Sequence, residues 1–167
     1  MKPASPILNQ LINLFWTAVC CTPVVLYWSS ADRSWLWPLL ALSAPGLLIS
    51  SRFYRLSRKR RFYESLGVKW VRLWVQDGEL IARFTRKKIP DHRIIRNRRA
   101  GRNYLRTVTV YERYHFLGFL FFTFSTVHAV CYGRPGMALL LLVCNIIYNI
   151  YPLLLQQFNR IRLEKMK

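Results

Sequence analysis

Acidic residues are scarce in this chain of 167 residues. Seven are Asp or Glu and 26 are Lys or Arg, so the formal net charge is +19. No pair of carboxylates resembles a glycosidase site, and no phosphate-binding glycine loop, zinc motif or nucleophile elbow is present. The sequence therefore excludes the enzyme classes that are recognised by those motifs.

Cysteine is also rare, with four residues: Cys20, Cys21, Cys131 and Cys144. None has metal-ligand spacing with another Cys or His, so we expect neither a metal site nor a disulfide. A secretory signal is lacking too. The only early charge, Lys2, precedes an apolar segment that is too long and has no small-residue cleavage site. We therefore expect this first segment to be retained as an anchor.

Charge is separated from apolar sequence along the chain. Residues 52–113 carry 19 of the 26 Lys and Arg and five of the seven acids, and long apolar runs flank this segment. A hydrophobic content of 53% with 15% aromatic residues excludes a disordered chain of this charge. A nucleic-acid-binding protein would not place its charge between apolar runs of bilayer length, so we expect no nucleic-acid partner. The pattern predicts an all-α polytopic membrane protein.

About four transmembrane helices are predicted in a single membrane domain, residues 1–167, with a large basic cytoplasmic loop. Three apolar segments, 7–28, 114–132 and 137–156, are long enough to cross a bilayer. The second predicted span, 35–51, is short and contains prolines, so a re-entrant segment is an alternative.

Two basic segments set the predicted orientation. The large loop, 52–113, and the tail, 157–167, both lie beside predicted spans, and segments rich in Lys and Arg stay on the cytoplasmic side. Both termini are therefore expected in the cytoplasm. The arginines near the membrane are expected to bind anionic lipid headgroups, at about 1 kcal/mol per charge.

An amphipathic segment lies inside the basic loop. Four large apolar residues recur in it at helical spacing: Leu66, Trp70, Leu73 and Trp74. This spacing favours a helix that lies in the membrane interface. The alternation of residues before Asp77-Gly78 would also suit a β-hairpin. We favour the interfacial helix.

Two titratable residues stand at the start of the third predicted span. Glu112 and His115 are three residues apart, so they share one face of a helix. A carboxylate at this spacing can orient an imidazole and favour its charged form, as a general base requires. The alternative is an interfacial ion pair that only ends the helix.

Four amide side chains and one proline form a stripe along the fourth predicted span: Asn145, Asn149, Pro152, Gln156 and Asn159. On an ideal helix they fall within an arc of about 80°. Amides inside a bilayer face the bundle interior, where they bond another helix or a polar ligand. Helix packing and ligand binding are both open interpretations of this stripe.

Arginines are dense in the second half of the basic loop: Arg93, Arg96, Arg98, Arg99, Arg102 and Arg106. Guanidinium groups pair bidentately with phosphate, so these residues could hold a phosphorylated donor. The alternative is that their charge only sets topology and binds headgroups. Two other histidines, His92 and His128, are expected in a loop and in helix packing, respectively.

Several motifs between residues 62 and 163 resemble a known family. Glu112-x-x-His115 precedes an apolar hairpin that ends in Asn149-Ile-Tyr-Pro-Leu-Leu-Leu-Gln156-Gln-Phe-Asn159-Arg160-Ile-Arg162-Leu163. Upstream stand Phe62-Tyr63-Glu64 and Lys88-Ile-Pro-Asp91, followed by His92 where the family pattern has glycine. Together these motifs resemble the small membrane acyltransferases typified by glycosyl diaponeurosporenoate acyltransferase of staphyloxanthin synthesis.

The resemblance implies a reaction and roles for residues. A fatty acyl group would pass from an acyl thioester, on coenzyme A or an acyl carrier protein, to a hydroxyl of a membrane glycolipid in a bacterial inner membrane. Glu112 and His115 would be catalytic, and no bound cofactor is expected. Six residues are candidates for substrate binding: Arg106, Arg113, Asn149, Gln156, Asn159 and Arg160.

A non-catalytic membrane adaptor is the alternative function. Its basic loop would bind anionic lipid, nucleic acid or an acidic partner, and the amide stripe would serve only in packing. An ion or proton pathway is disfavoured, because only Glu112 and His115 titrate near the membrane in that pattern.

Overall fold

The computed structural model describes residues 5–74 and 98–164, and its regular elements in these ranges are all helical. This agrees with the predicted all-α class. The longer helices are α1 (Ser5–Ser30), α7 (Arg98–Cys131), α8 (Pro135–Asn145) and α9 (Tyr151–Glu164). The shorter ones are η1 (Arg33–Trp35), α2 (Leu36–Ser43), η2 (Ala44–Leu47), α3 (Ser51–Tyr54), α4 (Arg60–Ser65), α5 (Val68–Trp74) and the π-helical η3 (Ile146–Ile150).

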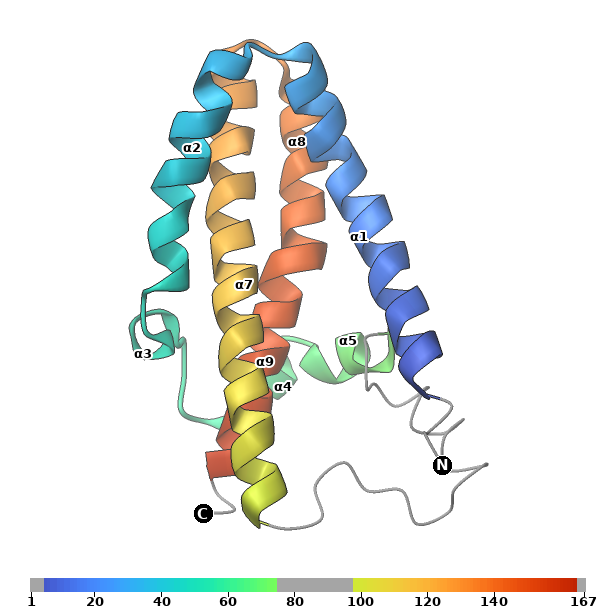
Figure 1. Cartoon of the computed structure of the whole chain (residues 1–167), viewed down its shortest axis with the longest axis vertical. Coiled ribbons are helices and arrows are strands. Elements are labelled where there is room, and N and C mark those ends of the chain that lie inside the picture. The colour runs from blue at the N-terminus through green and yellow to red at the C-terminus, as the bar shows by residue number, and fades with distance from the viewer. Residues whose placement is uncertain (1–4, 75–97, 165–167) are drawn as a thin grey trace.

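A long helical hairpin forms the centre of the bundle (Figure 1). Helix α7 runs in one direction, and α8, η3 and α9 return beside it as one nearly continuous rod. Helix α1 packs on α8, and α2 with η2 packs on α7. Helices α3, α4 and α5 lie at the end where α1 begins and α9 ends, which we call the basic end (Figure 1).

Three helical stretches are long and apolar enough to cross a membrane: Ile7–Ser30, Asn103–Cys131 and Pro135–Glu164. In their most apolar windows only 22%, 22% and 39% of the residues, respectively, are buried inside the protein. Most of their apolar side chains therefore face outward, as they do in proteins surrounded by lipid. These features indicate a membrane protein.

The segment predicted as a second span, 35–51, is a broken helix in the structure. Helix α2 passes into the 3₁₀ turn η2, which holds Pro45 at its start. Proline lacks the N–H that would continue the helical hydrogen bonds. Gly46 lets this turn lie close to α7, because an added Cβ would be 3.2 Å from the Leu117 Cα. The segment is not among the three candidate spans, so a fourth crossing is not confirmed.

The predicted basic loop is partly helical. Residues 68–74 form helix α5, so the interfacial-helix interpretation is favoured and the hairpin over these residues is wrong. Helix α7 already begins at Arg98, well before the predicted start at 114. The Asp77-Gly78 turn, His92, Arg93 and Arg96 fall outside the described residues.

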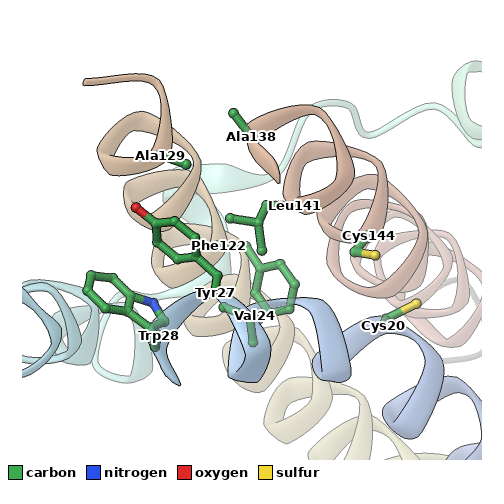
Figure 2. Close-up of a cluster of buried hydrophobic side chains, with 9 residues drawn as sticks. All are labelled: Cys20, Val24, Tyr27, Trp28, Phe122, Ala129, Ala138, Leu141 and Cys144. Atoms are coloured by element: carbon green, nitrogen blue, oxygen red, sulfur yellow. The ribbon is translucent and has the colours of Figure 1, made fainter. Parts of the chain in front are cut away.

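Two clusters of buried apolar side chains fill the bundle. The cluster far from the basic end joins α1 to α7 and α8 (Figure 2): Cys20, Val24, Tyr27, Trp28, Phe122, Ala129, Ala138, Leu141 and Cys144. His128 packs there, bonded to the Tyr27 hydroxyl and stacked on Tyr132, as expected for a packing histidine. The cluster at the basic end joins α4 and α5 to α9: Tyr63, Val68, Leu154, Leu155, Phe158 and Ile161.

Candidate active site at the basic end

Glu112 on α7 and Arg160 on α9 form a buried ion pair. Their exposed fractions are 0% and 8%. Arg160 donates from Nε to Glu112 Oε1 at 2.9 Å and from Nη2 to both Glu112 Oε2 and the Thr109 hydroxyl. A guanidinium with two donors facing one carboxylate is the strongest geometry for such a pair. This pair fixes the register between the two helices at the basic end.

The predicted contact between Glu112 and His115 is not present in this structure. Both Glu112 oxygens face Arg160, and His115 Nδ1 is buried without a hydrogen-bond partner among the described residues. The physical reason is that a buried carboxylate gains more from a bidentate cation than from a neutral imidazole. Glu112 therefore does not orient His115 directly.

His115 lies beside the π turn η3, which connects α8 to α9. Its ring meets that of Tyr148 edge to face, with 5.9 Å between centroids. The backbone of Tyr148 and the side chain of Asn149 are next to the imidazole. π turns occur mostly as single distortions of α-helices and are frequent at functional sites. The structure thus brings together two residues predicted for the site, His115 and Asn149.

Two asparagines connect the π turn to α7. Asn145 donates to the Phe119 carbonyl at 3.2 Å and to the Thr123 hydroxyl at 3.1 Å. Asn149 donates to Asn145 Oδ1 at 2.9 Å. The other side of the Asn149 amide lies against Gly118, where an added Cβ would be 2.3 Å from Asn149 Oδ1. Asn145 therefore serves in helix packing, whereas the Asn149 side chain lies between Gly118 and the neighbourhood of the His115 ring.

The π turn changes the face that the predicted polar stripe occupies. One extra residue in a helical turn rotates everything after it by about 100°. As a result Gln157 and Arg160 are buried, while Gln156 and Asn159 are only half-buried. The predicted alignment assumed an ideal helix, so it is wrong beyond Asn149.

Gln157 is a residue of this region that the sequence analysis missed. Its side chain accepts from the Leu56 backbone N–H at 3.3 Å and donates to the Tyr54 carbonyl at 3.1 Å. The Tyr63 hydroxyl is 2.9 Å from Gln157 Oε1 and also accepts from the Ser57 N–H. Gln157 thereby ties the chain between α3 and α4 to α9. Tyr63 belongs to a motif quoted for the family, but without the π turn no pattern pointed to Gln157.

Tyr54, at the end of α3, borders the same region. Its ring stacks on Phe116 of α7 with 4.2 Å between centroids. Burial raises the pKa of Tyr54 to about 12, and the negative charge of Glu112 acts in the same direction. Tyr54 therefore keeps its proton and remains able to donate a hydrogen bond.

Five buried polar atoms near the contact of α3 and α7 with η3 and α9 have no partner among the described residues. One is a donor, Arg55 Nε, and the other four can accept a hydrogen bond: Tyr54 Oη, His115 Nδ1, Asn149 Oδ1 and Gln156 Oε1. Buried polar atoms in folded proteins are almost always hydrogen-bonded. Amide oxygens accept, and an imidazole nitrogen accepts when the hydrogen is on the other ring nitrogen. This region, the acceptor cluster, therefore suits a ligand that donates several hydrogen bonds.

The remaining predicted site residues lie around this region without a described role in it. Arg106 and Arg113 are exposed on α7, and Asn159 is half-buried on α9. Arg98, Arg99 and Arg102 belong to the first turns of α7. Whether these residues contact a substrate stays a prediction.

Comparison with known proteins identifies the family. The family model described as glycosyl-4,4'-diaponeurosporenoate acyltransferase matches residues 47–167. The match includes all four residues of the acceptor cluster and the Glu112–Arg160 pair. Searches of curated proteins and of solved structures found no match. The predicted resemblance is confirmed, and the chain belongs to the glycosyl-4,4'-diaponeurosporenoate acyltransferase family.

Proposed function

We propose that this protein transfers a fatty acyl group from an acyl thioester to a hydroxyl of a membrane glycolipid at the basic end of the bundle. The observation that carries the proposal is the acceptor cluster: three acceptor atoms and one hydroxyl, buried and unpartnered, in the segment that matches an acyltransferase family. A sugar supplies several hydroxyl donors, which complement such a set. A purely hydrophobic ligand would leave these atoms without partners.

His115 is the proposed general base. In the tautomer with its hydrogen on Nε2, the unpartnered Nδ1 takes the proton of the acceptor hydroxyl as that oxygen attacks the thioester carbonyl carbon. The tetrahedral intermediate then collapses, the carbon–sulfur bond breaks, and the leaving thiolate takes the proton from the imidazolium. The products are the new ester and the free thiol.

The neighbouring residues have supporting roles in this scheme. The oxygens of Asn149 and Gln156 accept hydrogen bonds from other hydroxyls of the acceptor and fix its orientation. Arg113 is exposed on α7 and stays a candidate for binding the substrate. Glu112 and Arg160 are proposed as positioning residues, because their ion pair holds α7 against α9.

The membrane setting is part of the proposal. The basic end carries Arg58–Arg61 and most of the other described cations, so we place it at the cytoplasmic face of a bacterial inner membrane. Anionic lipid headgroups would then surround it. Acyl-CoA or acyl carrier protein would deliver the donor from this side.

Lipid mass spectrometry on a bacterial host that makes carotenoid glycosides tests the proposal. Cells that express this chain should contain a glycolipid heavier by one fatty acyl group, and cells with an empty vector should not. If no lipid changes although the protein reaches the membrane, this acceptor class is wrong. The membrane-adaptor interpretation would then be favoured.

A further inference from the structure

Two arginines lie over one buried ring at the basic end. The guanidinium carbons of Arg60 and Arg162 are 5.3 Å and 5.9 Å from the centroid of the Phe158 ring. Phe158 itself is 1% exposed, and its cluster joins α4 and α5 to α9. Guanidinium groups that stack on a ring keep their N–H donors free at the edges. The ring therefore holds two cations in place without using their hydrogen bonds.

A third arginine belongs to the same group. Helix α5, which carries Arg72, packs on α9, and Val68 of α5 shares a buried cluster with Phe158. The charge of Arg72 therefore acts on Arg162, as does that of Arg60. Figure 1 shows α4 and α5 across the lower part of α9, which explains how residues distant in sequence meet here. Arg60, Arg72 and Arg162 thus come from three separate helices; we call them the arginine triad.

Among the described residues, 5–74 and 98–164, few carboxylates lie near the triad. Glu64 bonds to Arg60 at 2.7 Å and is also 3.4 Å from Lys69, so one carboxylate already serves two cations. Within the described ranges, neither Arg72 nor Arg162 has an ion pair with a carboxylate. Like charges held near each other repel, and the repulsion is relieved when an anion binds between them.

One member of the triad, Arg162, lies on the same helix as a residue of the proposed site. Arg162 is two residues beyond Arg160, the partner of Glu112, on the same helix. Residues two apart leave a helix on different faces, so a ligand that reaches both the triad and the acceptor cluster would pass around the basic end of α9. A phosphorylated carrier with a long flexible arm can take this path.

We propose that the arginine triad is a phosphate-binding site. The phosphate belongs either to the carrier of the acyl donor or to the headgroup of an anionic lipid. The first assignment rests on the proposed function. In both cases the recognised chemistry is the same, because planar guanidinium groups pair with phosphate oxygens through several charge-assisted hydrogen bonds.

Binding to the full chain in phosphatidylcholine nanodiscs tests the site, with coenzyme A as the probe. The double variant Arg72→Gln/Arg162→Gln removes two members of the triad. The control, Arg52→Gln/Arg58→Gln, removes the same charge from two exposed arginines of the basic end. The triad variant should bind coenzyme A about tenfold more weakly or worse, and the control should stay within about threefold of wild type. Melting temperatures verify that both variants fold.

Native mass spectrometry in nanodiscs that contain phosphatidylglycerol distinguishes the two phosphate sources. Retention of this lipid by wild type and its loss from the triad variant, without binding of coenzyme A, would assign the site to a lipid headgroup. Equal weakening in the triad and control variants would overturn the proposal, because the binding would then be diffuse. Retention of neither probe by wild type would overturn it as well.

The variant His115→Ala separates this inference from the proposed function. It should retain binding at the triad while acyl transfer is lost. If His115→Ala abolishes transfer but the triad variant binds both probes normally, the phosphate site fails and the proposed function stands. If binding depends on the triad and no transfer occurs in wild type, the proposed function fails and the phosphate site stands.

Discussion

Glu112 and Arg160 are joined across the central helix pair by a buried, multiply hydrogen-bonded ion pair. The partners are 48 residues apart in sequence, and no water-exposed surface of Glu112 remains. A buried charge whose partner is removed stays uncompensated in an environment that solvates it poorly. The pair therefore connects the stability of the basic end directly to the geometry of the proposed site.

Glu112→Gln should destabilise the folded protein and not only slow acyl transfer. The substitution leaves the guanidinium of Arg160 buried without its counter-ion, at a cost of about 3–5 kcal/mol in the free energy of unfolding. Denaturant unfolding in detergent measures this cost. The double variant Glu112→Leu/Arg160→Met, which removes both charges, should recover much of the stability. A Glu112→Gln protein as stable as wild type would show that the pair contributes little.

Gly118→Ala should push α7 away from the π turn. The new Cβ would be 2.3 Å from Asn149 Oδ1, so the side chain or the helix must move. Overpacking of this kind typically costs about 1–3 kcal/mol. Gly136→Ala is the matched control, because nothing lies within 4 Å of its Cβ position and alanine favours the helix there. Melting temperatures of the two variants should differ, and equal values would contradict the close packing at Gly118.

Two adjacent glutamines should respond differently to replacement by leucine. Gln157→Leu removes the partner of the Leu56 N–H and of the Tyr54 carbonyl, so stability should fall by about 1–3 kcal/mol. Gln156→Leu removes an unpartnered oxygen, so stability should be unchanged or higher while acyl transfer decreases. Unfolding and transfer assays on both variants measure the contrast. Equal loss of stability in the two would show that Gln156 is also a packing residue.

Acid should loosen α4 and α5 through Glu64. Burial acts to raise the pKa of this carboxylate, but the hydrogen bonds and charges of Arg60 and Lys69 outweigh it and leave the pKa below its ordinary value of 4.5. A lowered pKa contributes stability that is complete above the ordinary value and is lost as pH falls through the lower, folded value. Hydrogen exchange over residues 60–73 should therefore accelerate in that acidic window. Glu64→Gln should remove this pH dependence, and a variant that keeps it would assign the effect to another group.

The long helices could be predicted from sequence because long apolar runs indicate segments that lipid surrounds. The ends of these helices could not be predicted in the same way. Helix α7 continues from Arg98 through many charged residues, and apolar periodicity does not reveal a helix that extends into water. The short segment at 35–51 shows the same limit, because packing against α7 decides its form.

The residues of the site were predicted better than their contacts. His115 and Asn149, both predicted for the site, lie next to each other, but Glu112 pairs with a residue on another helix, which sequence spacing cannot show. The π turn at Ile146–Ile150 also has no pattern of its own in the sequence. Because it rotates α9, Gln157 is buried and Gln156 is only half-buried, contrary to the ideal-helix alignment.

Acyl transfer by His115 is most directly tested by comparing two histidine variants in the same glycolipid-producing host. His115→Ala removes the proposed base, whereas His128→Gln changes a histidine that packs in the cluster far from the basic end. At equal amounts of protein in the membrane, mass spectrometry should show the acylated glycolipid with His128→Gln. With His115→Ala we expect its rate of formation to be lower by about 10²–10⁴-fold. An undiminished rate with His115→Ala would contradict the account.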